Sequence, residues 1–511
     1  MKGWWAQLVT GLLLVFAAGC GGALPPSPVP TVSIVSPGPS PSIIATPATL
    51  APTDLPRVTG PTLTPVPPPP EPTPAPSATV ALAPAPRPEY DLAADVDAIA
   101  HTVVVTASVM LTPPDSQELV FNLNALQMPG VFQLRELRVG ADLATPQAEG
   151  VWVHVPLRPG LTPNDRLTVT FTYQLTLPAD VSTALGWRGS LSWSPRQINL
   201  GDWYPVLAVY RPGQGWVTHA PAAIGEYQTA EAADFKVTLR AQGFTAKPLV
   251  LGSGQAVDCA EHCFTLSGGR FVAYMLSDYM QSRSLTTSGG VTVTSAYFPG
   301  HFLAGRAALE VAAGALDRFS QLFGPYPYST YALVEGDFDD GMEYSGMSFV
   351  GETYYVAYDQ SANNWLTAIT AHETAHQWWY SLVGNDQALE PWLDEALCTY
   401  SEPVYLEAAH PPVVPNWWHW RVDIHRPTGA VNSPIYAFDA FRPYVNAVYL
   451  RGAQMLQAMR QAVGDGRFFA FLRRYAEANV GHIATESDFW SAYESVGGDA
   501  AAIKANFFAE P

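Results

Sequence analysis

The sequence predicts an α+β protein, with a β-sandwich-like domain in its first half and a mainly helical domain in its second half. From residue 90 to about 285, β-branched and aromatic residues recur in short alternating segments separated by turn residues. After about residue 300, apolar residues recur at helical spacing instead. The predicted organisation is a signal segment, a linker, a β domain and a helical domain at residues 1–20, 21–88, 89–298 and 299–511.

The first twenty residues have the features of a bacterial export signal. Lys2 supplies a positive charge, residues 8–16 form a short apolar stretch, and Ala17-Ala18-Gly19-Cys20 resembles a lipoprotein cleavage box. The apolar stretch is too short for a good transmembrane helix. We therefore expect an exported protein of the cell surface, anchored to a membrane by a lipid on Cys20. Ala17 stands where such boxes usually have leucine, so simple signal cleavage is the alternative.

Residues 21–88 are rich in proline, serine, threonine and alanine and contain few charges. A segment of this composition cannot bury a core, and it is typical of an extended, semi-rigid spacer. At about 3.1 Å per residue the spacer could reach on the order of 200 Å. We expect it to hold the globular part away from a membrane or through a cell-wall layer. A protein-binding role for the four prolines at 67–70 is the alternative.

The globular part divides into strand-like and helix-like segments. Strands are expected at 101–109, 167–175, 235–240 and 291–297, all within the β-sandwich-like domain. Helices are expected at 304–323 and near 445–463, 465–478 and 485–495.

The formal charge of −19 argues against nucleic-acid binding, because 45 acidic residues outnumber 26 lysines and arginines and no basic stripe is present.

The chain has four cysteines. Cys259 and Cys263 are close enough in sequence for a disulfide, which suits an exported protein. His262 between them suggests a metal site, but no fourth donor is nearby. Cys398 is expected to be a buried, unreactive thiol.

The segment His372-Glu373-Thr374-Ala375-His376 has the H-E-x-x-H pattern of a zinc site. Histidines at i and i+4 share one face of a helix, so both imidazoles can reach one ion. Glu395 can complete a His₂Glu set and leave a fourth position for water. Glu373 lies between the histidines and can accept a proton from that water. The pattern arises by chance in roughly one chain of this length in a hundred.

The surroundings of this motif favour a helix. Asn363 or Asn364 could cap its start, and Gly384 could end it. A second short helix beginning near Pro391 would carry Glu395. Apolar positions recur at helical spacing around the motif: Trp365, Leu366, Ile369, Ala375, Trp379 and Leu382. The motif therefore indicates a zinc hydrolase, most simply a peptidase.

The chain resembles the M1 family of zinc aminopeptidases, also called gluzincins, over roughly residues 89 to 508. The family pattern is H-E-x-x-H, eighteen residues, then E, and this spacing separates His376 from Glu395. Where the family usually has Asn-Glu-Gly, this chain has Asp394-Glu395-Ala396. Further resemblance lies in the segments 200–205, 323–328, 341–344, 371–379, 392–396 and 449–453.

The resemblance implies an N-terminal β domain, whose edge helps to form the substrate cleft, and a thermolysin-like catalytic domain with one zinc ion. The chain stops about where that catalytic domain should end, so we expect a short form without the large C-terminal helical domain of many M1 enzymes. That absence would leave the cleft more open. The acidity of the chain favours basic or neutral peptides over acidic ones.

By resemblance, His372, His376 and Glu395 bind the zinc ion and Glu373 is the general base. Tyr449 heads the Tyr-Leu-Arg-Gly-Ala segment and is expected to donate a hydrogen bond to the oxyanion. Two further expectations, from the residues alone, are that Tyr444 is the competing candidate for this donor and that Glu402 orients a zinc-binding histidine.

Gly341, Met342 and Glu343 are expected to bind the substrate, with Glu343 pairing with its free α-amino group. Asp340 and Tyr344 depart from the family's Gly-Ala-Met-Glu-Asn. The predicted function is removal of N-terminal residues from peptides. An endopeptidase using the same zinc site, and a noncatalytic surface-binding protein with a peptidase fold, are the alternatives.

Overall fold

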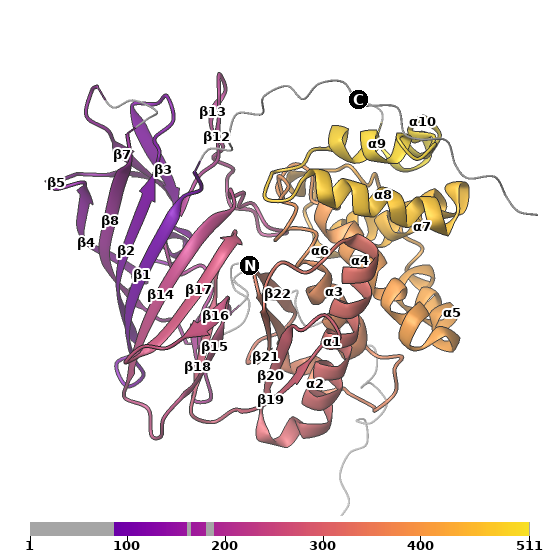
Figure 1. The fold of residues 1–511 in the computed structure, drawn as a ribbon, viewed down its shortest axis with the longest axis horizontal. Coiled ribbons are helices and arrows are strands. Elements are labelled where there is room, and N and C mark those ends of the chain that lie inside the picture. Colours follow the sequence, from indigo (N-terminus) through magenta and orange to yellow (C-terminus); the bar gives the residue numbers. More distant parts are fainter. Residues whose placement is uncertain (1–85, 161–164, 180–188, 510–511) are drawn as a thin grey trace, which may run out of the picture. The chain divides into compact units, whose positions relative to one another are not determined.

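A computed structural model describes residues 86–160, 165–179 and 189–509, all within one compact unit, Ala85–Pro511 (Figure 1). The predicted signal segment with Cys20, and the predicted linker as far as residue 85, lie outside the described residues. Their roles stay predictions.

The first half is built around an eight-stranded sheet with the order β16-β17-β14-β1-β2-β8-β4-β5. Buried and less buried residues alternate along its long strands, because successive side chains of a strand point to opposite faces. The strands are β1 Glu89–Asp97, β2 Thr102–Leu111, β4 Phe132–Val139, β5 Asp142–Leu143, β8 Leu167–Thr176, β14 Ala233–Gln242, β16 Gln255–Val257 and β17 His262–Gly269.

Two four-stranded sheets and one hairpin complete this half. One sheet has the order β15-β18-β10-β9 and the other β11-β3-β7-β6, and β12 pairs with β13. Their bounds are β3 Glu118–Asn122, β6 Gln147–Glu149, β7 Trp152–Pro156, β9 Leu191–Trp193, β10 Ile198–Leu200, β11 Val206–Leu207, β12 Tyr210–Arg211, β13 Gly215–Trp216, β15 Leu249–Gly252 and β18 Tyr274–Ser277. The predicted disulfide is present, and Cys259–Cys263 links the turn after β16 to the start of β17.

A five-stranded mixed sheet begins the second half, with the order β19-β20-β21-β23-β22. Its strands are β19 Gln281–Thr286, β20 Thr292–Tyr297, β21 Thr330–Gly336, β22 Gly341–Tyr344 and β23 Met347–Gly351. The strand expected at 291–297 therefore does not join the β-sandwich-like part. It pairs in parallel with β21, and α1 Phe302–Phe323 forms the crossover between the two strands. The domain boundary after residue 298 stays a prediction.

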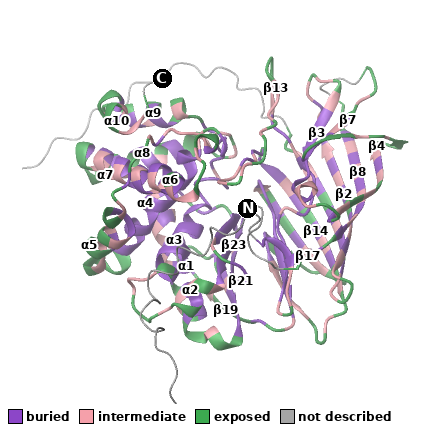
Figure 2. Cartoon of the chain, turned by 180° about the vertical axis from the view of Figure 1, so that it is seen from behind, coloured by how far each residue is buried: buried purple, intermediate pink, exposed green. Residues whose placement is uncertain are grey.

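Helices make up most of the remaining chain, which confirms the predicted α+β class. The α-helices are α2 Glu352–Val356, α3 Trp365–Ala375, α4 Trp392–Ala409, α5 Val414–Trp417, α6 Phe441–Tyr444, α7 Arg451–Val463, α8 Asp465–Ala478, α9 Glu486–Glu494 and α10 Ala500–Phe507. In Figure 2, α3 and α4 are largely buried, and every residue of α4 from Trp392 to Leu406 is buried. Among the described helices, none has both the length and the apolar character needed to cross a bilayer.

The strand-rich and helical parts are joined by a buried arginine. Arg270 follows β17 and is 3 % exposed. Its guanidinium donates hydrogen bonds to the carbonyl oxygens of Ala230, Ser381 and His482, at 2.6, 3.2 and 2.7 Å. These bonds fix the segment before β14 against the chain that follows α3, and both segments border the site described next.

Candidate zinc and peptide-binding site

Helix α3 carries the H-E-x-x-H motif and begins as the sequence indicates. The side chain of Asn364 caps its start by accepting a hydrogen bond of 3.0 Å from the backbone N–H of Thr367. Its predicted end at Gly384 is wrong. The helix ends at Ala375, and the backbone N–H of Ser381 folds back to the carbonyl of His376 at 3.0 Å. His376 is therefore the C-terminal cap of α3 and still shares a face with His372.

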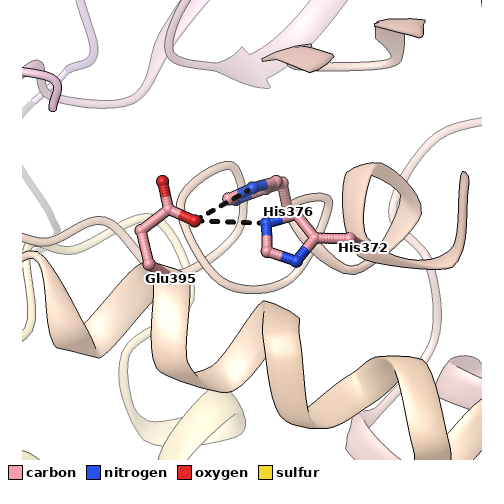
Figure 3. Close-up of side chains that lie close together, drawn as sticks. All are labelled: His372, His376 and Glu395. Atoms are coloured by element: carbon pink, nitrogen blue, oxygen red, sulfur yellow. Dashed lines mark hydrogen bonds and ion pairs between the residues drawn. The ribbon is translucent and has the colours of Figure 1, made fainter. Parts of the chain in front are cut away.

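Glu395 lies in the first turn of α4, which packs beside α3, and the structure brings the three predicted ligands together (Figure 3). One carboxylate oxygen of Glu395, Oε2, lies 3.1 Å from Nε2 of His372 and 3.8 Å from Nε2 of His376. Ligands of a tetrahedral zinc ion, at about 2.1 Å from the metal, are themselves about 3.4 Å apart. All three residues are buried, with no more than 4 % of each exposed. Their type, burial and spacing fit zinc.

Both histidines turn their other ring nitrogen toward a second carboxylate. Nδ1 of His372 lies 3.2 Å from Oε1 of Glu402, and Nδ1 of His376 lies 2.7 Å from Oδ1 of Asp394. A carboxylate at Nδ1 holds the proton there and leaves Nε2 as the metal-binding atom. Glu402 therefore lies at the position from which it can orient His372, as expected. Asp394 has the corresponding position at the other histidine, and the sequence did not indicate this role.

Glu402 is itself fixed by a buried network. The Arg421 guanidinium donates to both carboxylate oxygens of Glu402 at 2.9 and 3.1 Å, and the indole N–H of Trp417 donates at 3.0 Å. Burial alone would raise the pKa of Glu402, but Arg421 and His372 outweigh it and hold the pKa below its usual value. Asp394 has no such arginine among its hydrogen-bond partners and accepts a bond of 3.0 Å at Oδ2 from the side-chain N–H of Gln387.

Glu373 faces the same space as the ligands. Its Oε2 is buried without a hydrogen-bond partner, and burial raises the pKa of its carboxyl to about 7, even though both histidines lower it. Gly341 on β22 lies against this carboxylate, where a Cβ atom would collide with Oε1. Glycine at this position therefore makes room for the predicted general base.

Glu343 lies beside the zinc-binding residues. One oxygen of Glu343, one of Glu373 and a ring nitrogen of His376 all lie within 4.8 Å of one another. Glu343 is 3 % exposed and its Oε1 has no hydrogen-bond partner. Burial raises its pKa well above the usual range, although the nearby His376 lowers it. A cation brought by a substrate would supply the partner that this carboxylate needs.

Tyr449 reaches the site from a π-helical segment, Val445–Leu450, which follows α6. Its ring lies parallel to the ring of His372, with the centroids 5.9 Å apart, and its hydroxyl hydrogen-bonds Glu395. Burial alone would raise the pKa of Glu395, but His372 and His376, with a smaller contribution from Tyr449, hold it below its usual value. Tyr444 packs edge-on against Tyr449, with ring centroids 5.4 Å apart, and is fully buried. The structure thus places Tyr449, rather than its competitor, against the zinc-binding residues.

A pocket opens beside Glu343 and is bordered by both halves of the chain. Asp202 and Glu226 come from loops of the strand-rich half, Tyr344 lies at the end of β22, and Tyr380 follows α3. Nothing in the sequence alone assigns a role to Asp202, Glu226 or Tyr380. The only signal for Asp202 was its place in the segment 200–205 that resembles the family.

One further group of possible metal-binding side chains among the described residues lies apart from this site. His301, Glu335 and Glu352 are close together, but the guanidinium of Arg196 pairs with Glu352 and with Asp337. A resident arginine supplies the positive charge that a metal ion would bring, so this cluster is an ion-pair network. Cys398 is a free, buried thiol, as expected, with its sulfur 3.2 Å from Nδ1 of His376.

Two histidines and a glutamate lie together, and a buried carboxylate orients each histidine. With a second buried acid, Glu343, on the mixed sheet, they define a metallopeptidase domain of the zinc type. Comparison with known proteins identifies its family. Residues 307–507 match the peptidase family M1 domain, so this part of the chain is an M1 peptidase domain, and the family predicted from the motifs is confirmed.

Curated relatives and a solved structure agree with this family. Aminopeptidase M1-B of Oryza sativa subsp. japonica is 29% identical over 219 residues, which are 38% of this chain and 24% of the relative. Human endoplasmic reticulum aminopeptidase 1 is 27% identical over 240 residues, 44% of this chain and 25% of the relative. The matches thus span about a quarter of each curated relative's length.

The fold has a counterpart that matches over nearly its whole length. The M1 zinc metallopeptidase of Deinococcus radiodurans, solved as a variant bound to a Tyr-Ser-Ala substrate, aligns with a TM-score of 0.60 at 16% identity. The alignment covers 83% of this chain and 95% of that one. The predicted arrangement of a β domain followed by a helical domain is therefore that of a known M1 metallopeptidase.

Proposed function

We propose that this protein is an aminopeptidase that removes N-terminal residues from peptides with one zinc ion bound by His372, His376 and Glu395. The observation that carries the proposal is the position of Glu343. Its buried carboxylate lies within 4.8 Å of Glu373 and His376, so a substrate ammonium paired with it would set the first peptide bond beside the zinc-binding residues. The relatives named above as aminopeptidases support this assignment.

The zinc ion, when bound, would polarise the scissile carbonyl and lower the pKa of the attacking water. Glu373 accepts the proton of that water and then passes it to the leaving amine. Its carboxylate suits this task because it faces the zinc-binding residues and its Oε2 is buried without a hydrogen-bond partner. Because Gly341 has no side chain, the carboxylate of Glu373 has room to face the substrate.

Tyr449 and Glu343 act on two different groups of the substrate. The Tyr449 hydroxyl, beside Glu395, would donate a hydrogen bond to the oxygen that becomes negative in the transition state. Glu343 would hold the α-ammonium group, and this ion pair would be formed only by peptides with a free N-terminus. Peptides are the proposed substrates, and the tripeptide bound by the Deinococcus radiodurans structure supports this class.

The proposed location is the outer cell surface, with the protein held by a lipid on Cys20 and the proline-rich segment as a spacer. The support for this part is the sequence alone: the apolar stretch at 8–16, the cleavage box that ends in Cys20, and the composition of residues 21–88.

The decisive experiment compares paired peptides with free and acetylated N-termini, with and without a zinc chelator. We expect stepwise trimming of the free peptides and loss of all cleavage with the chelator. Acetylation leaves Glu343 buried without its partner, which should reduce kcat/KM about a hundredfold or more. Glu343→Ala should slow the free peptides far more than the acetylated ones.

Two results would replace this function by another. Internal cleavage of acetylated peptides at rates like those of free peptides, with Glu343→Ala slowing both equally, would indicate an endopeptidase using the same site. No cleavage of any peptide by zinc-loaded protein would favour a noncatalytic binding protein. Glu310→Gln is a suitable control, because Glu310 is an exposed acid on α1 whose recorded ion pair is with Arg306.

A further inference from the structure

We propose that Gln377 is a positioning residue that sets the distance between Glu343 and the zinc-binding residues. The inference rests on the proposed aminopeptidase function and adds the residue that fixes where the ammonium group of the substrate is held relative to the zinc ion. It follows from two hydrogen bonds of one buried amide and from a second connection that runs beside them.

Gln377 connects the zinc motif to the hairpin that carries Glu343. It follows His376 directly, and its side chain is fully buried. The side-chain oxygen accepts a hydrogen bond of 2.8 Å from the backbone N–H of Gly346, and the side-chain N–H donates one of 3.0 Å to the backbone carbonyl of Tyr344. Both ends of the amide are therefore used, and both partners are backbone groups.

These two backbone groups lie at the turn between β22 and β23, the two strands that pack beside α3 (Figure 1). Glu343 precedes Tyr344 and His376 precedes Gln377, so one peptide unit on each side separates these bonds from the proposed ammonium anchor and from the zinc ligand. A movement of the turn relative to α3 would therefore move the Glu343 carboxylate relative to the zinc-binding residues.

Ser348 forms a second connection between the same two elements. It pairs directly with Glu343 across the β22–β23 ladder, so the two side chains lie on the same face. Its hydroxyl donates a hydrogen bond of 3.1 Å to the backbone carbonyl of Glu373 and accepts one of 3.0 Å from the hydroxyl of Tyr331. The hairpin is thus held to the zinc motif at two points, at its turn by Gln377 and opposite Glu343 by Ser348.

The carboxylate of Glu343 depends on this support. Its Oε1 is buried and has no hydrogen-bond partner, so no bond to that oxygen fixes its position. The backbone of β22 has to hold the carboxylate where it is, with one oxygen within 4.8 Å of Glu373 and His376. A displacement of about 1 Å from the productive geometry lowers a rate on the order of a hundredfold. The two bonds of Gln377 therefore act on the register between the substrate's ammonium group and the zinc ion.

Gln377→Met tests this role, because methionine has nearly the shape of glutamine but cannot make the two hydrogen bonds. The probes are two zinc-binding hydroxamates with the same side chain, leucine hydroxamate and its analogue without the α-amino group. Only the first carries an ammonium group for Glu343, so the ratio of their dissociation constants reports how well Glu343 and the zinc ion are placed for one ligand. Isothermal titration calorimetry on zinc-loaded protein gives both constants without turnover.

We expect wild-type protein to bind leucine hydroxamate about a hundredfold tighter than the analogue, and Gln377→Met about tenfold tighter or less. The analogue should bind both proteins with affinities within about threefold of each other, because it does not use Glu343. Gln174→Met is the matched control. It removes a hydrogen bond with Arg135 in the strand-rich half and should keep the wild-type ratio.

A double-mutant cycle shows whether Gln377 acts through Glu343. In Glu343→Ala protein the ammonium group has no anchor, so adding Gln377→Met should change the ratio by less than about twofold. A loss there as large as in the protein with Glu343 would overturn the proposal, because Gln377 would then act on another contact of the ligand.

The two proposals fail in different ways. An unchanged ratio in Gln377→Met overturns the positioning role and leaves the aminopeptidase function intact. Equal weakening of both hydroxamates in this variant, or loss of its zinc, also overturns the positioning role, because that pattern is general damage to the site. Equal binding of both hydroxamates by wild-type protein overturns both proposals, since Glu343 would then not hold the ammonium group.

If Gln377→Met does not fold, Gln377→Asn decides. Asparagine keeps the amide but is one carbon atom shorter, so it cannot reach both backbone groups. The ratio should then fall at least about threefold, and an unchanged ratio contradicts the proposal.

Discussion

Replacing Asp394 by asparagine tests whether the carboxylate behind His376 strengthens metal binding. Asp394 Oδ1 lies 2.7 Å from Nδ1 of His376, and asparagine keeps the shape of the side chain but removes its charge. A hydrogen bond to a charged acceptor contributes about 1.5–3 kcal/mol, and a neutral one about 0.5–1.5 kcal/mol. The difference, together with the usual effect of such outer partners, predicts a zinc dissociation constant raised about ten- to a hundredfold.

The same substitution should change the stability of the metal-free fold much less. The hydrogen-bond partners of Asp394 are a side-chain N–H of Gln387, Nδ1 of His376 and the thiol of Cys398, and no arginine is among these three. Asparagine can keep most of these contacts, so we expect a loss of about 1 kcal/mol or less in the free energy of unfolding.

Glu402→Gln should destabilise the metal-free fold more than Asp394→Asn does. It leaves the guanidinium of Arg421, which is 5 % exposed, without its charged partner. Removing one member of a buried ion pair costs about 3–5 kcal/mol. Competition with a chelating dye would measure the zinc affinity of both variants, and urea unfolding of metal-free protein would measure stability. An unchanged zinc affinity in Asp394→Asn, or a stability loss as large as that of Glu402→Gln, would refute the reasoning.

Three shorter predictions follow from other residues. Glu373→Gln should keep zinc by elemental analysis yet lose most turnover, whereas His376→Ala should lose both, and equal metal loss in the two would contradict their roles. Burial raises the pKa of Glu335 to about 8, so its protonated form favours the fold. The free energy of unfolding should therefore fall as pH rises from about 4.5 to 8, by up to about 4 kcal/mol, and Glu335→Gln should remove this dependence in urea titrations at several pH values. Cys20→Ser should move the protein from membrane to soluble fractions, and unchanged membrane retention would exclude the lipid anchor.

Periodicity predicted the elements that bury a broad apolar face. The helix expected at 304–323 is α1 Phe302–Phe323, and the helix expected at 465–478 is α8 with the same bounds. The two histidine ligands could be predicted equally well, because local helix geometry alone brings positions i and i+4 to one face. Glu395 required a tertiary contact, and it was indicated by its place about twenty residues after the motif on a second predicted helix, together with the family spacing.

Periodicity failed where tertiary contacts decide the structure. Apolar residues continue at helical spacing beyond Ala375, yet α3 ends there, because the following chain turns back and bonds to carbonyls of the motif itself. The strand at 292–297 alternates like those of the β domain, but it pairs with β21 across the α1 crossover. Alternation shows that a strand has a buried face, and it does not show which sheet the strand joins.

The residues that sequence reasoning missed share one physical property: their roles depend on a partner far away in the chain. Tyr380 and Asp202 are ordinary residues in the sequence and become pocket walls only after the strand-rich half meets the chain that follows α3. The zinc motif is local, and it therefore indicates the type of chemistry. The pocket beside Glu343, in contrast, has walls contributed by both halves, and no local motif indicates it.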